Sequence, residues 1–115
     1  MGPEAAIDLI NRYISREHLD DIDANCPLMA LPTDIAHAGP AARDAYRQVL
    51  ETMVGFFEAN LQRQSHMMSR QRALALSAIC VGAMVLARTI DDEALKDEIC
   101  EAARAFANSA IAEER

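Results

Sequence analysis

The sequence contains no tryptophan and only five aromatic residues, two tyrosines and three phenylalanines, together with four glycines and four prolines. So few aromatic residues disfavour a β-sandwich, because strands are enriched in them. Alanine occurs 22 times, and alanine has the highest intrinsic helix propensity. We therefore expect an all-α protein with a single domain over residues 1–115, long enough to bury its own core without metals or disulfides.

Basic residues are also scarce. There are 11 of them against 18 acidic residues, for a net charge of −7, and Lys96 is the only lysine. Affinity for duplex DNA comes mainly from Lys and Arg side chains that neutralise phosphates. We therefore expect no direct DNA contact by this chain.

The three cysteines, Cys26, Cys80 and Cys100, are odd in number and show no CxxC spacing. This pattern predicts reduced thiols in a cytoplasmic setting. The first residues lack the basic and apolar regions of a signal peptide, and no stretch is expected to reach the ~18 apolar residues of a membrane span. We expect a cytoplasmic protein with no membrane association.

Apolar residues recur at steps of three and four along most of the chain, which predicts amphipathic helices. Five helices are expected, over residues 4–15, 25–39, 40–63, 69–87 and 91–110. Cys26-Pro27 is a typical helix start after Asn25, and Pro32 predicts that the second helix is short, kinked or restarts there. Ser69 is a candidate N-cap, as are Asp91 and Asp92.

The segments 15–25 and 62–69 are predicted to be loops. The first carries Asp20, Asp21 and Asp23, but it lacks the glycine and terminal glutamate of an EF-hand, so we expect a solvated loop and no metal. On the helices, Arg47 is expected to pair with Glu51 and Arg104 with Glu101, each on a wet face.

The stretch from Ala73 to Ala87 is apolar almost all the way round, so it needs cover on more than one side. The final helix adds a second apolar stripe, which is predicted to be buried. A chain of 115 residues has few layers, and self-association is the economical solution: the last two helices of two copies would form a four-helix bundle around a two-fold axis. The predicted interface residues are Ala75, Ala78, Gly82, Leu86, Leu95, Ile99, Ala103, Phe106 and Ala110.

Three pieces of the sequence together resemble a known family. They are Tyr13-Ile14-Ser15 with His18, Cys26-Pro27-Leu28 with Ala30-Leu31, and the run from Gly82 to Arg88 before Asp91-Asp92-Glu93-Ala94-Leu95. Their order, over Ile7 to Ala110, resembles the C-terminal regulatory domain of TetR/AcrR-type transcriptional repressors. None of them is a catalytic signature, and we expect no enzymatic activity.

The resemblance implies a helical domain that dimerises through its last two long helices and encloses a small-molecule pocket in each subunit. The ligand would then shift the angle between two DNA-reading heads. The chain departs from the family because no helix-turn-helix head has a counterpart before Pro3, so DNA would be contacted only through that missing domain. Pro32 also departs from the family's uninterrupted helix.

Soft, polarizable side chains offer a surface that an apolar effector could contact. Met53, Phe56, Phe57, Met67, Met68 and Met84 supply this surface, with Cys80 and Leu50 as the floor and Tyr46 or His66 as polar handles. The competing interpretation is ordinary core packing, because stripes at this spacing usually belong to a core. We expect no cofactor.

Two further alternatives remain open. Cys26 at a helix N-terminus has the setting of a reactive thiolate, or it is a small apolar side chain at an ordinary capped start. The whole chain is either a small-molecule-sensing and homodimerising domain or a helical interaction module that dimerises without a ligand. His18, His37 and His66 are too scattered to predict a chelate.

Overall fold

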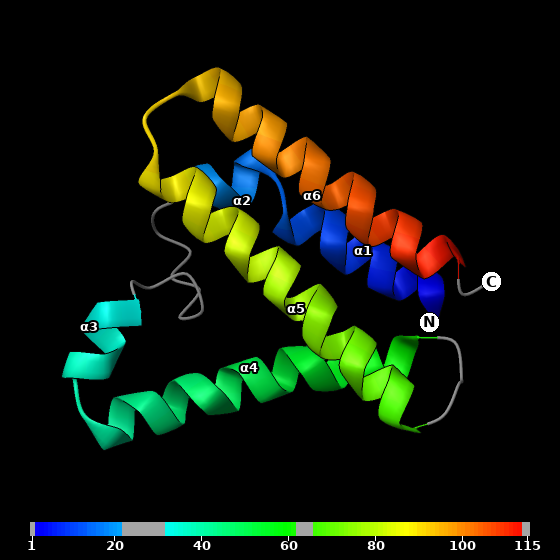
Figure 1. Cartoon of the computed structure of the whole chain (residues 1–115), viewed down its shortest axis with the longest axis horizontal. Coiled ribbons are helices and arrows are strands. Elements are labelled where there is room, and N and C mark those ends of the chain that lie inside the picture. Colours follow the sequence, from blue (N-terminus) through cyan, green and yellow to red (C-terminus); the bar gives the residue numbers. More distant parts are fainter. Residues whose placement is uncertain (1, 22–31, 62–65, 114–115) are drawn as a thin grey trace.

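The computed structural model describes residues 2–21, 32–61 and 66–113, which form six helices and no strand (Figure 1). The all-α prediction is confirmed. The helices are α1 (Pro3–Tyr13), α2 (Arg16–Asp20), α3 (Pro32–His37), α4 (Pro40–Asn60), α5 (His66–Thr89) and α6 (Glu93–Glu113).

Two predicted loops were wrong in part. α2 lies inside the segment predicted as a loop, because Ser15 caps it: the Ser15 hydroxyl accepts a hydrogen bond of 3.1 Å from the backbone N–H of His18. α5 begins at His66, one turn before the predicted cap at Ser69. The predicted helix start at Cys26 lies outside the described residues, while α3 begins at Pro32, where a missing N–H is tolerated.

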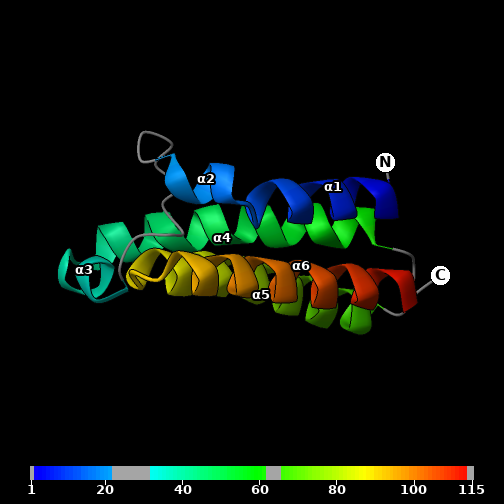
Figure 2. The same cartoon turned by 90° about the horizontal axis from the view of Figure 1, so that it is seen from above.

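The molecule is a flat slab of 38 × 37 × 19 Å. Its radius of gyration of 14.5 Å exceeds the roughly 13 Å typical of a round domain of this length. Figure 2 shows why: α1 and α2 lie on one side of the α5–α6 pair, and no described helix lies on its other side. Because packed helices are about 8–10 Å apart, 19 Å leaves room for two layers only.

The core lies where α5 meets α4, α1 and α6. One stripe of α5 faces it at helical spacing, through Ala73, Leu76, Cys80, Met84 and Ala87, which are all at most 3% exposed. α1 contributes Ala6 and Ile10, and Phe57 of α4 is fully buried. α5 packs most extensively against α6 and α4. Its opposite side faces away from this core.

Polar contacts fix the outer helices to this core. The Asn60 side chain at the end of α4 accepts a hydrogen bond of 3.1 Å from the backbone N–H of Gly2, just before α1. Arg70 of α5 pairs with Glu51 (3.0 Å) and Glu58 (3.2 Å) of α4. Arg16 of α2 donates to Glu93 and to Asp97 of α6, the latter at 2.8 Å.

By length and composition alone, one stretch of the described helices could cross a membrane. It is Ser69–Thr89 within α5, with a mean hydropathy of 1.5. The core helix of a globular protein meets the same criterion, but only 39% of this stretch is buried in the molecule. Leu74 and Leu86 are the large apolar side chains of this stretch that stay exposed.

Candidate functional site

The residues predicted to form a dimer interface lie together on the uncovered side of α5 and α6. On α5 they recur at steps of three and four, which places them on one side of the helix, and the same holds for α6. We call this surface the α5–α6 face; it comprises Ala75, Ala78, Gly82, Leu86, Leu95, Ile99, Ala103, Phe106 and Ala110. Of these residues, Ala75, Phe106 and Ala110 line one hollow between α5 and α6, and helical spacing places the others on the same sides of the two helices.

Three large apolar side chains of this face are exposed in the single copy. Phe106 is 67% exposed, Leu86 60% and Leu95 41%. Isolated apolar residues on a surface are ordinary, but a contiguous apolar patch marks a contact site. The α5 part of the face carries no charge, since no charged residue occurs between Ala73 and Ala87.

Within one copy this α6 stripe is only partly covered, with Leu95 41% and Phe106 67% exposed. The core side of α6 is formed by Cys100, Ala107 and Ile111, each at most 1% exposed. Ile99 and Ala103 are half-buried beside them, and Phe106 points further outward. α6 therefore carries two apolar stripes, one that faces the core of the copy and a second, the predicted one, that the copy covers only in part.

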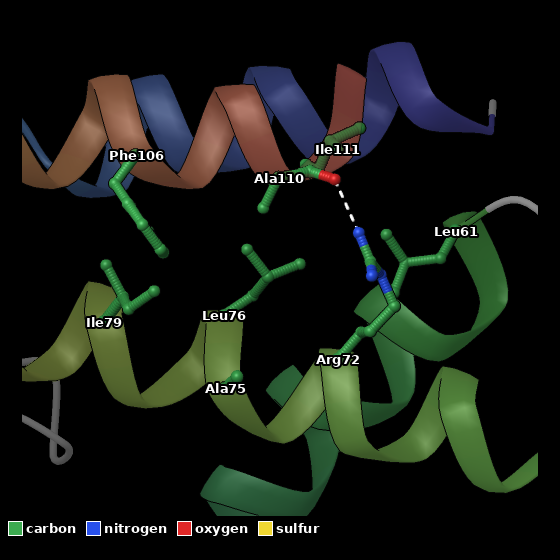
Figure 3. Close-up of a pocket in the computed structure, with 8 residues that line it drawn as sticks. All are labelled: Leu61, Arg72, Ala75, Leu76, Ile79, Phe106, Ala110 and Ile111. Atoms are coloured by element: carbon green, nitrogen blue, oxygen red, sulfur yellow. Dashed lines mark hydrogen bonds between the residues drawn. The ribbon is translucent and has the colours of Figure 1, made fainter. Parts of the chain in front are cut away.

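The face contains a groove of about 180 Å³ between α5 and α6 (Figure 3). Its walls are Ala75, Leu76 and Ile79 on α5 and Phe106, Ala110 and Ile111 on α6, while Leu61 at the end of α4 and Arg72 complete the lining. The groove is smaller than the roughly 300–1,000 Å³ of typical ligand pockets. It is therefore suited to a single side chain or a very small ligand.

Among the described residues that line this groove, Arg72 alone is charged. Its guanidinium group donates a hydrogen bond of 2.6 Å to the backbone oxygen of Ala110, across the groove (Figure 3). This bond ties the start of α5 to the last turns of α6. This contact between the two helices therefore holds one end of the groove in place.

The sequence did not predict Leu61, Arg72, Leu76, Ile79 and Ile111 as groove residues. Ile79 continues the Ala75–Gly82 stripe at a step of four, so periodicity alone could have found it. Leu61 has no such signal, because it reaches the groove from α4 through the tertiary fold.

The residues predicted to bind an effector lie mainly in the core. Met53 is 9% exposed, and Phe57, Cys80 and Met84 are fully buried in one cluster, against which Tyr46 and Leu50 pack. Phe56 is 39% exposed, and its ring meets that of Phe57 edge-on at 6.2 Å between centroids. None of these residues lines the groove of the α5–α6 face. The side chains of His66 and Met67 lie outside the described part of the structure.

The two described thiols are shielded from water. Burial raises the pKa of the Cys80 thiol to about 12, and burial also raises the pKa of the Cys100 thiol. Both cysteines are therefore protonated and poorly nucleophilic at neutral pH. Cys26, the candidate reactive thiol, lies outside the described residues.

A second, polar hollow lies beside the turn between α1 and α2. It has a volume of about 320 Å³ and is lined by Asn11, Arg12, Ser15, Glu17, His18 and Asp21. The His18 ring lies at the edge of this hollow, where a hydrogen bond of 2.8 Å between Nδ1 and the backbone oxygen of Tyr13 holds it. Over residues 2–21, 32–61 and 66–113, no three His, Cys, Asp or Glu side chains group in a way that could hold a metal ion.

Comparison of the chain with protein-family models, with curated proteins and with solved structures found no significant match.

Proposed function

We propose that two copies of this chain associate through the α5–α6 face, and that the dimer is the regulatory body of a TetR/AcrR-like transcriptional repressor. The observation that carries the pairing is the flat, two-layered fold, whose uncovered side exposes Leu86, Leu95 and Phe106. In the proposed dimer, α5 and α6 of both copies form a four-helix bundle around a two-fold axis.

The size of the face supports a stable pair. α6 has 21 residues and is therefore about 30 Å long, and two adjacent helices are about 20 Å wide. The face thus covers roughly 600 Å² per copy, or about 1,200 Å² in total, at the lower end of specific interfaces. Ala75, Ala78 and Gly82 are small, which allows the backbones of two copies to approach closely.

A pair of glycine substitutions tests the interface. Gly82 and Gly55 both lie within helices, and a Cβ atom added at either position meets no other atom within 4 Å. An arginine at either position is therefore compatible with the fold of one copy. At Gly82, however, it would bury an unpaired charge in the interface, while Gly55 on α4 serves as the matched control.

Size-exclusion chromatography with light scattering gives the readout. The unmodified chain and Gly55→Arg are expected at about twice 12.6 kDa, and Gly82→Arg at about 12.6 kDa with unchanged circular dichroism. An unmodified chain that is monomeric at micromolar concentration would contradict the proposal.

The second part of the proposal is an apolar small-molecule effector bound near Met53, Phe57, Cys80 and Met84. It is supported by the resemblance to the TetR/AcrR regulatory body and by the soft side chains that α4 and α5 place in one cluster. A ligand that binds only the folded state must raise the melting temperature. A thermal-shift screen of apolar drugs and lipids is the corresponding test, with Met84→Ala expected to abolish or change the response to a hit.

The alternative is an interaction module that dimerises without a ligand. It is favoured by the packing of Phe57, Cys80 and Met84, which are buried as fully as ordinary core residues. A broad library that produces no thermal shift would support this alternative, and it would leave the proposed dimer intact.

A further inference from the structure

We infer that the groove of the α5–α6 face receives the Phe106 side chain of a second copy, so that two phenyl rings cross the two-fold axis and lock the dimer. This inference rests on the dimer proposed above and specifies its central contact. It starts from two features of one copy that lie side by side, an exposed aromatic ring and an apolar hollow.

The first feature is Phe106. Its side chain is 67% exposed, the largest exposed fraction among the large apolar residues of the described chain. A phenylalanine side chain buries roughly 150–250 Å² when covered, so it is a strong anchor for association. Its neighbours at steps of three and four on α6 are small: Ala102, Ala103, Ser109 and Ala110. The ring lies at the rim of the groove and extends from α6 toward Ile79 of α5 (Figure 3).

The second feature is the groove, whose size matches one ring. Its volume is about 180 Å³, and a cavity of about 150 Å³ lined by apolar side chains accepts one benzene molecule. Ala75 and Ala110 leave its mouth open, while Leu76 and Ile79 supply its apolar wall. Arg72 is engaged with the Ala110 carbonyl at one end of the groove, and the remaining lining offers an apolar environment to an incoming ring.

Symmetry connects the two features. In an isologous dimer the same patch meets itself, so a ring that enters the partner's groove is matched by the partner's ring entering its own groove. Because Phe106 also lines the groove, each incoming ring lies against the resident Phe106 ring. Such aromatic pairs are favourable in edge-to-face or offset geometry. The two-fold axis would then pass close to Phe106.

Two substitutions remove this contact from opposite sides. Phe106→Ala removes the ring and leaves the groove open, while Ala75→Trp fills the groove and leaves Phe106 in place. Each variant is expected to weaken the homodimer by roughly a hundredfold or more, as for a buried aromatic hot spot. Phe56→Ala is the matched control, because Phe56 is a 39% exposed phenylalanine on α4, outside the groove and the α5–α6 face.

Mixing the two variants gives the decisive result. Neither homodimer can insert a ring, but a heterodimer can insert one: Phe106 of the Ala75→Trp copy enters the open groove of the Phe106→Ala copy. Native mass spectrometry of an equimolar mixture is expected to show heterodimer well above the statistical half of all dimers. Ala110→Leu repeats the test from the α6 wall if Ala75→Trp does not give a folded chain by circular dichroism.

The outcomes separate this inference from the proposal on which it rests. A dimeric unmodified chain whose dissociation constant changes less than threefold in Phe106→Ala, or a mixture with no excess of heterodimer, would overturn the inference and leave the dimer standing. A monomeric unmodified chain would overturn both.

Discussion

The guanidinium group of Arg104 on α6 donates a hydrogen bond of 2.6 Å to the backbone oxygen of Ile14, which lies 90 positions earlier in the chain. Ile14 is the C-cap residue directly after α1, where carbonyl groups have no partner within the helix. Its side chain is fully buried. Arg104 therefore caps α1 from a different helix and fixes the angle at which the chain turns toward α2.

Replacing Arg104 with alanine is expected to lower the free energy of unfolding by about 1.5–3 kcal/mol, because a carbonyl loses a charged hydrogen-bond donor. Urea denaturation followed by circular dichroism measures the change. Arg12→Ala is the control, since the Arg12 side chain is 80% exposed and pairs only with Asp8 on its own helix. That variant should change stability by less than about 0.5 kcal/mol, and equal effects of the two substitutions would refute the capping role.

The ion pairs between α2 and α6 predict an acid-dependent loss of stability. A hydrogen bond from Arg16, with a smaller contribution from Lys96, holds the pKa of Glu93 below its ordinary value of 4.5. A carboxyl group whose pKa is depressed in the folded state stabilises that state above the unfolded-state pKa, and the contribution is lost as the pH falls through the folded-state value. We therefore expect stability to decrease below about pH 4.5.

Glu93→Gln removes this titration, and its unfolding free energy should fall less steeply than that of the unmodified chain between pH 5 and pH 3. Urea titrations at several pH values give the slope. Glu98→Gln, a substitution at an exposed position on the same helix, is the matched control. Identical slopes for the Glu93 variant and the unmodified chain would show that the Arg16–Glu93 pair does not contribute to the pH dependence of stability.

The buried thiols should resist labelling in the folded state. With the pKa of Cys80 raised to about 12 by burial, almost no thiolate exists at pH 8, and the side chain is inaccessible. Iodoacetamide followed by peptide mass spectrometry should leave Cys80 and Cys100 unmodified in buffer and modify both in urea. Labelling of Cys80 in buffer at the rate seen in urea would mean that the core opens readily.

Two glycines, one inside α4 and one just before it, should respond to alanine in opposite directions. Gly55 lies inside the helix with open space where a Cβ would be, so Gly55→Ala should stabilise the fold by about 0.5–1 kcal/mol. Gly39 precedes the helix with a φ of 101°, which side chains disfavour, so Gly39→Ala should destabilise it by a similar amount or more. Thermal unfolding should show a higher melting temperature for Gly55→Ala and a lower one for Gly39→Ala than for the unmodified chain.

The elements predicted correctly are those with long apolar periodicity. α4 and α6 bury residues at helical spacing, and their ends fall close to the predicted ones, with Asp92 capping α6 through a hydrogen bond of 3.1 Å from the Leu95 N–H. α2 was missed because a helix of five residues is too short to show the apolar periodicity of a helix. The N-cap at Ser15 is its local sign in the sequence.

The side-chain pairing could not be predicted from spacing. Arg47 forms its ion pair with Asp44 at 2.8 Å, and the expected partner Glu51 pairs with Arg70 of α5 instead. Arg104, expected on a wet face, reaches the end of α1. Local spacing identifies which partners lie within reach on one helix, but a neighbouring helix offers contacts that only the tertiary arrangement reveals. The groove beside Phe106 could not be predicted from the sequence for the same reason, because the tertiary fold brings Leu61 and Ile111 to it.

The thinness of the slab, 19 Å, has a consequence for how the protein responds to its own abundance. With only two layers, much of the apolar surface of α5 has no shelter in a lone molecule, so under the proposed pairing the folded state gains free energy by mass action as copies accumulate. Heat resistance would then rise with protein concentration, and dilution alone would bring the chain closer to unfolding.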